Sequence, residues 1–206
     1  MYFLFMREPI MECATEVDMS VSQAIQTRCS VRSYRNENLD RETVQVLLDA
    51  AVRAPTAMHE EPWAFLVIQD RHLLKTISDR AKPLFAEQIR RSGSERSSRS
   101  FDHYASPDFN IFYDAGTLIV IWDKPIGLFN EADCWLAAEN LILAACAKGL
   151  GTCVIGSALE ALNLPETKSE LGVADDYSAI APIIVGYPAG ETPASSRRKP
   201  LVLAWR

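Results

Sequence analysis

Apolar residues recur along much of the chain with the spacing of α-helices. After Asp40, for example, Val44, Leu47 and Leu48 fall on one helical face, and Pro55 ends the pattern. Asp40 itself belongs to the residue types that cap helix N-termini. Comparable spacing predicts helices over 21–28, 41–54, 72–91 and 132–149, the last ending at Gly149.

Four shorter runs are almost continuously apolar and partly β-branched, as is typical of strands buried on both faces. They cover 64–69, 117–122, 152–155 and 179–187. Because these runs alternate with helices and no repeat of the chain is visible, the pattern predicts an α/β or α+β domain of three layers, α/β/α.

The length of 206 residues suits one domain, and 48% apolar with 23% charged residues is usual for a globular protein. Residues 1–19 lack the basic lead and long apolar run of a signal peptide. We therefore expect an N-terminal extension at 1–19 and a single domain at 20–206. The segment 90–110 is rich in serine and arginine, and this composition predicts a loop or lid.

The net charge of −6 argues against general attraction to nucleic acid or to anionic membranes. No apolar run reaches the length of a membrane span. The five cysteines form no C-x-x-C pair, which favours reduced thiols and a cytoplasmic location. The three histidines lie far apart in the sequence, so we expect no protein-held metal.

Candidate chemistry begins at Arg28-Cys29-Ser30-Val31-Arg32, after the first predicted helix. Two guanidinium groups and a hydroxyl so close together could hold a phosphate through charge-assisted hydrogen bonds. They could equally form an ordinary solvated helix end.

Three further segments also have two interpretations. The proline-bounded turn 54–63 could face a planar ligand or could simply connect a helix to a strand. The glycines of 149–156 permit close approach to a ligand but also suit a helix cap. The basic residues that follow Gly186-Tyr187-Pro188, at 197–199, could neutralise a phosphate or could form a solvated tail.

Together and in this order, the four segments resemble the FMN-dependent nitroreductase family. The resemblance rests on RCSVRSY, APTAMHEEPWAFLVI, GLGTCVIG and IVGYP with a following basic pair, and it extends from about Ser20 to Trp205. It implies a nitroreductase-like fold, in which helices flank a mixed, mainly antiparallel sheet. It also implies a homodimer with tightly bound FMN at the subunit interface.

The same resemblance implies roles for individual residues. In the family, the first motif and a basic pair near the C-terminus hold the FMN phosphate, a turn of the partner chain contacts the flavin, and backbone after the glycine motif lies by flavin N5. The matching positions are Arg28, Cys29, Ser30 and Arg32, then Pro55, Thr56, Ala57 and His59, then Val154, Ile155 and Gly156, and finally Arg197 and Arg198. Arg32 would reach the pyrimidine edge. His59 replaces the family's usual asparagine, and Glu61 replaces its glutamine.

The activity implied is ping-pong electron transfer, in which NAD(P)H reduces FMN at N5 and a nitroaromatic compound, quinone or similar acceptor then takes the electrons. Such chemistry resides in the cofactor and requires no catalytic side chain. Because one fold hosts several chemistries, alternatives remain. They are a dehalogenating or flavin-fragmenting flavoenzyme, a flavin-binding or sensing protein with little turnover, and a globular protein without cofactor.

Overall fold

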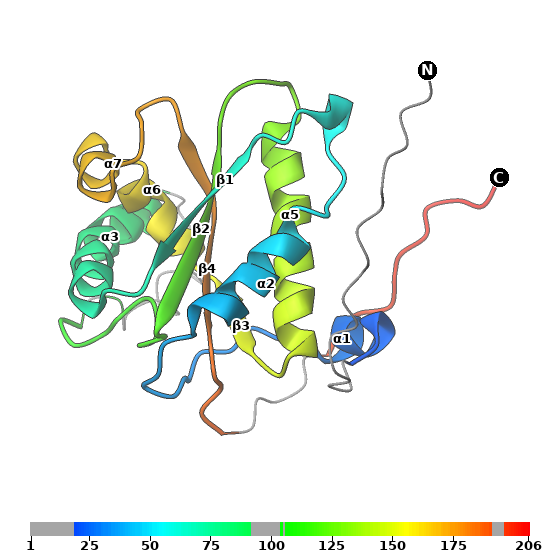
Figure 1. Cartoon of the computed structure of the whole chain (residues 1–206), viewed down its shortest axis with the longest axis horizontal. Coiled ribbons are helices and arrows are strands. Elements are labelled where there is room, and N and C mark those ends of the chain that lie inside the picture. The colour runs from blue at the N-terminus through cyan, green and yellow to red at the C-terminus, as the bar shows by residue number, and fades with distance from the viewer. Residues whose placement is uncertain (1–18, 92–103, 105, 191–195) are drawn as a thin grey trace, which may run out of the picture.

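A four-stranded sheet forms the middle layer of the structure, with helices on both faces (Figure 1). The computed structural model describes residues 19–91, 104, 106–190 and 196–206. The strands are β1 (Trp63–Ile68), β2 (Thr117–Asp123), β3 (Gly151–Val154) and β4 (Ser178–Gly186). They lie in the order β1-β2-β4-β3, and each neighbouring pair is antiparallel. The predicted three-layer α+β fold with a mainly antiparallel sheet is confirmed.

Side chains of the central strands alternate between two apolar clusters, because successive residues of a strand point to opposite faces. On β2, Leu118 and Val120 face one cluster, whereas Ile119 and Ile121 face the other, and all four are fully buried. In Figure 1, α3 (Arg71–Arg91), α6 (Leu159–Leu162) and α7 (Pro165–Leu171) cover the first face. The second face carries α2 (Arg41–Ala51) and α5 (Asn130–Ala147), with α1 (Val21–Thr27) packed against α5.

Helix ends follow the capping residues in the sequence. The Asp40 carboxylate accepts the Thr43 N–H at 2.7 Å, which satisfies a backbone donor that the helix itself leaves free. Gly149 follows the end of α5 with φ of 72°, a left-handed conformation that suits glycine. Both predicted helix boundaries are therefore confirmed.

Some elements differ from the prediction or lie beyond it. α3 continues through Pro83 as one helix of 21 residues, in agreement with the predicted 72–91, whereas α2 ends at Ala51 rather than at residue 54. The short helices η1 (Ala57–His59) and η3 (Gly156–Ala158), like α6 and α7, were not predicted. The proposed extension 1–19 lies almost wholly outside the described residues, as does most of the predicted loop 90–110. Among the helices that the structure describes, none combines the length and apolar character needed to cross a membrane.

Cys134 lies fully buried on α5, with its Sγ 3.8 Å from the Trp122 carbonyl oxygen on β2. Burial, reinforced by the nearby carboxylates of Asp123 and Asp133, raises the pKa of the Cys134 thiol to about 12. The folded protein thus keeps this proton above the pH at which an unfolded chain loses it.

Because the pKa of the Cys134 thiol is raised, we expect the free energy of unfolding to fall in alkali. The stabilisation from this thiol is complete below the ordinary thiol pKa of about 9 and is lost as pH rises through about 12. The contribution amounts to at most about 1.4 kcal/mol per pH unit. Urea unfolding of wild type and Cys134→Ala between pH 8 and 11 measures it, with Cys146→Ala as the control. Parallel pH profiles for wild type and Cys134→Ala would contradict the expectation.

Candidate functional site

The first candidate motif forms an extended segment, residues 28–35, between β3 and the chain that follows β4. The Val31 N–H donates to the Thr152 carbonyl, and the Arg35 N–H donates to the Tyr187 carbonyl, both at 2.9 Å. These backbone bonds bring together three predicted segments that are far apart in the sequence, around residues 28, 150 and 187.

The side chains of this segment have different surroundings. Val31 is only 5% exposed, so it packs against the body of the protein. Ser30 and Arg32 are exposed and both lie close to the Cys153 thiol, whereas the half-buried Arg28 lines a separate, smaller cavity. The segment therefore carries one hydroxyl and two positive charges.

Glycines allow this segment to lie so close to the sheet. A Cβ on Gly151 would fall 2.8 Å from three atoms of the Val31 side chain. A Cβ on Gly186 would fall 3.2 Å from the Tyr34 ring, whose hydroxyl donates to the Val31 carbonyl at 2.8 Å. The two glycines are thus required for close packing against the segment.

A cavity of about 640 Å³ opens beside Arg32 and the end of β3. Val154, Ile155 and Gly156 form part of its lining, together with Cys153 and Ser157. A Cβ on Gly156 would meet nothing within 4 Å, so the backbone there borders open space. Volumes of about 300–1,000 Å³ are usual for small-molecule sites.

The opposite wall of the cavity is aromatic. Phe85 on α3 stacks on Tyr104 at 5.0 Å between ring centroids, and Tyr104 stacks on Phe109 at the same distance. Phe109 meets Tyr113 edge-on at 5.6 Å, and the Arg32 guanidinium lies 5.9 Å from the Tyr113 ring centre. This wall was not predicted from the sequence. Tyr104 and Phe109, two aromatic residues within the predicted loop 90–110, were a signal that could have indicated it.

The cavity has a simple electrostatic character. Burial raises the pKa of the Cys153 thiol, an effect that the Arg32 charge partly opposes, and burial also raises the pKa of the Tyr113 phenol. Both groups are therefore neutral at neutral pH. Of the described residues that line the cavity, Arg32 alone carries a charge, so the site favours a ligand with negative character on that side.

The second motif lies at the other end of the sheet. Trp63, where β1 begins, pairs with Asp123 at the end of β2, whereas the first residue of β2, Thr117, pairs with Val185 near the end of β4. Strands of this length span about 20 Å. One chain therefore does not bring Pro55, Thr56, Ala57 and His59 to its own Arg32.

The turn that contains the second motif has an unusual backbone. Met58, His59 and Glu61 have φ values of 55°, 58° and 47°, in the left-handed region that non-glycine residues rarely adopt. Both carboxylate oxygens of Asp133, which is buried, accept the Ala57 N–H at 3.1 and 3.3 Å. His59 and Met58 are exposed, so the turn projects into solvent.

The remaining candidates, Cys29, Arg197 and Arg198, do not line the main cavity. Cys29 lines a smaller cavity of about 200 Å³, together with Arg28 and Cys146. Arg197 and Arg198 are exposed in an extended tail, and the Arg197 guanidinium donates to the neighbouring Ser196 carbonyl at 3.3 Å. Across the ranges that the structure describes, no three His, Cys, Asp or Glu side chains gather as metal ligands would.

Comparison with known proteins identifies this arrangement. The model of the nitroreductase family matches residues 25–187, a range that includes three of the four motifs in full and the start of the last. The chain belongs to the nitroreductase family. It is accordingly an oxidoreductase of that family.

Individual relatives in the nitroreductase family are distant but extensive. An Archaeoglobus fulgidus protein with the provisional name NADH dehydrogenase/NAD(P)H nitroreductase is 28% identical over 168 residues, covering 81% of this chain and 84% of that protein. Iodotyrosine deiodinase of Thermotoga neapolitana is 27% identical over 180 residues, covering 85% and 92%. A Bacteroides fragilis nitroreductase, solved with bound FMN, has 26% identity, a TM-score of 0.74 and coverage of 88% and 95%.

The glycine contacts predict the effect of two matched substitutions. Gly151→Ala should lower the free energy of unfolding by about 1–3 kcal/mol, because the new methyl group overlaps the Val31 side chain. Gly156→Ala should change it by less than about 0.5 kcal/mol, because its methyl group enters open space. Urea denaturation measures both, and equal effects would show that the 28–35 segment does not lie against β3.

Proposed function

We propose that this chain is an FMN-dependent oxidoreductase that passes electrons from NAD(P)H to nitroaromatic compounds, quinones or similar acceptors by a ping-pong mechanism. The observation that carries the proposal is the cavity beside Arg32, open at Gly156, together with Arg28 and Ser30 on the same segment as Arg32. The names of the relatives support the choice of FMN and NAD(P)H.

The residues present suit FMN. A phosphate dianion requires charged and hydroxyl donors, which Arg28 and Ser30 provide within three residues. Four residues of extended backbone span up to about 13 Å, so Arg32 can reach another part of an elongated ligand. The neutral lining and aromatic wall beyond Arg32 suit a planar, largely apolar ring system.

FMN, when bound, supplies the hydride and electron transfer, so the chain needs no nucleophile or general base of its own. Arg32 would stabilise negative charge at the pyrimidine edge, because its guanidinium faces a partly buried cavity without another charge among the described lining residues. Backbone at Val154 to Gly156 would allow close approach to the ring. The rings of Phe85, Tyr104 and Tyr113 would exclude water from the opposite side.

The site would be completed by a second copy of the chain. Pro55, Thr56, Ala57 and His59 lie at the opposite end of the sheet from Arg32, so they would contact a flavin held by the partner subunit. Exposed apolar side chains on α5 and α1, including Trp135 and Ile25, support a homodimer, because such surfaces commonly mark interfaces. Arg197 and Arg198 would add charge near the phosphate.

A dehalogenating activity is the second candidate, because the Thermotoga neapolitana relative is an iodotyrosine deiodinase and matches 85% of this chain. The two activities use the same cofactor and differ in the acceptor. Reduced protein mixed with 3-iodotyrosine or with menadione (2-methyl-1,4-naphthoquinone), in separate stopped-flow experiments, distinguishes them by which compound reoxidises it.

Purified protein tests the proposal directly. We expect a yellow protein that releases FMN rather than FAD on denaturation, sediments as a dimer and oxidises NADH or NADPH in the presence of menadione. A colourless protein that FMN does not bind would reject the proposal. A flavoprotein without turnover would instead indicate a binding or sensing role.

Loss of the Arg28 guanidinium should weaken FMN binding. Hydrogen bonds to charged groups contribute about 1.5–3 kcal/mol, so Arg28→Ala should raise the FMN dissociation constant about ten- to a hundredfold. Fluorescence titration of the FMN-free protein measures this constant. Arg35→Ala is the matched control, because Arg35 is an exposed arginine of the same segment that lines neither of the two cavities. If the two variants bind FMN equally well, Arg28 has no place in the phosphate site.

A further inference from the structure

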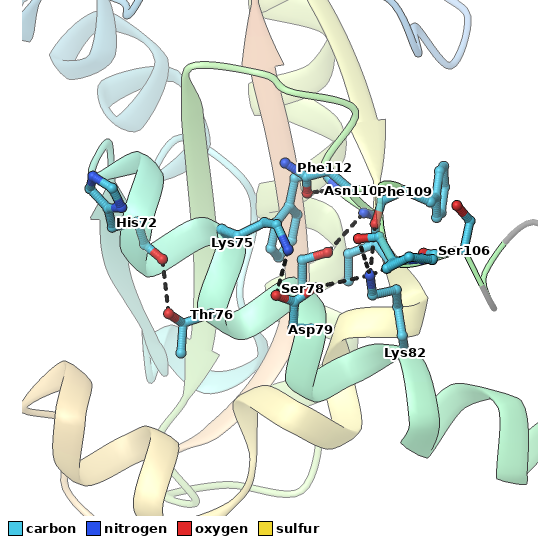
Figure 2. Close-up of polar contacts among 12 residues, drawn as sticks. His72, Lys75, Thr76, Ser78, Asp79, Lys82, Ser106, Phe109, Asn110 and Phe112 are labelled. Carbon is cyan, nitrogen blue, oxygen red and sulfur yellow. Dashed lines mark hydrogen bonds and ion pairs between the residues drawn. The ribbon is translucent and has the colours of Figure 1, made fainter.

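One lysine of α3 holds the segment that forms much of the aromatic wall (Figure 2). The Lys82 Nζ donates to the carbonyl oxygens of Ser106, Pro107 and Phe109 at 3.3, 3.2 and 3.0 Å. The Lys82 side chain is only 11% exposed. An ammonium group has three N–H donors, and here three main-chain carbonyls of one turn and the Asp79 carboxylate, at 2.9 Å, surround it.

Two other side chains fasten the same segment further along. The Ser78 hydroxyl, fully buried one helical turn before Lys82, accepts the Ile111 N–H at 3.1 Å. The Asn110 side-chain oxygen accepts the Phe112 N–H at 3.0 Å. Figure 2 shows Ser78 and Lys82 reaching from α3 to the segment that precedes β2, within which Asn110 makes its own contact.

The fastened segment ends in a strained conformation. Tyr113 and Asp114 have φ values of 51° and 55°, in the left-handed region. Non-glycine residues persist there only where the surroundings hold them. Tyr113 lines the cavity and meets Phe109 edge-on, and the Phe109 carbonyl accepts a hydrogen bond from Lys82. The position of the ring wall therefore depends on contacts made on α3.

We propose that Lys82 is a positioning residue that sets the shape of the acceptor side of the cavity. By fixing the turn at 106–109, it fixes Phe109 and, through ring contact, Tyr104 and Tyr113. The spacing between this wall and Gly156 then determines how large an aromatic acceptor fits beside the flavin. This inference rests on the proposed function, because it assigns the open part of the cavity to the acceptor.

Lys75 provides a matched control on the same helix. It lies two turns before Lys82 and pairs with the same carboxylate, Asp79, but its side chain is 50% exposed. The contacts that the structure gives to Lys75 lie within α3 and do not reach 106–113. Removing either lysine takes one partner from Asp79, whereas only Lys82 holds the wall.

Whether Lys82 positions the 106–113 segment can be measured without flavin or turnover. In FMN-free protein, Lys82→Met should increase amide hydrogen exchange across 106–113, and Lys75→Met should leave it as in wild type. Ser78→Ala provides a second variant that releases the same segment, should Lys82→Met fold poorly. Unchanged exchange in Lys82→Met, or equal changes in both lysine variants, would overturn the proposal.

The effect on specificity appears in a ratio that general destabilisation does not alter. We compare kcat/KM for the two-ring menadione with kcat/KM for the one-ring 1,4-benzoquinone. Lys82→Met should change this ratio by about tenfold, the lower end of the range over which pocket contacts with part of a ligand discriminate. The FMN dissociation constant should change by less than about threefold, since Arg28 and Ser30 hold the phosphate elsewhere.

Each combination of results either supports or contradicts the role proposed for Lys82. Altered exchange with an unchanged quinone ratio would show that Lys82 positions the segment but does not govern specificity, and the proposal would fall. Absence of flavin turnover in wild type would count against the proposed function instead. The hydrogen-exchange comparison would then still decide whether Lys82 positions the wall.

Discussion

Pairing between the extended segment 28–35 and β3 is the contact on which the candidate site depends. It rests on the backbone bond from Val31 to Thr152 and on the absence of a side chain at Gly151. The pairing sets Ser30 beside Thr152 and brings Arg32 to the cavity, while the buried Val31 supplies the apolar anchor.

The antiparallel sheet separates two functional regions that the sequence places close together. Only about twenty residues lie between the first and second motifs, yet the strand register puts them at opposite ends of the sheet. This arrangement makes a single subunit incomplete under the proposed function. It also means that Asp133, which holds the turn at Ala57, would act on a flavin bound by the partner.

Local signals explain why much of the fold could be predicted. Some features depend only on neighbouring residues and can therefore be predicted from the sequence. They include the Asp40 cap, the left-handed Gly149 and the apolar runs of β2 and β4. Lys82 is different, because its partners lie 24 to 27 residues away and are main-chain carbonyls of any residue type. No periodic pattern of residues in the sequence indicates such a contact. The motifs indicated the phosphate side of the site, but the aromatic wall required the tertiary structure.

Backbone strain is concentrated rather than dispersed. Among the described residues, the non-glycine positions with positive φ are Met58, His59, Glu61, Tyr113 and Asp114, all within two short turns. Each left-handed residue of this kind costs roughly 1 kcal/mol or more. Together they offset an appreciable part of the free energy of unfolding, which is typically about 5–15 kcal/mol for a domain. A sequence shaped by stability alone would accumulate glycine or asparagine at such positions. These two turns therefore lower the stability of the folded chain while fixing one particular backbone geometry.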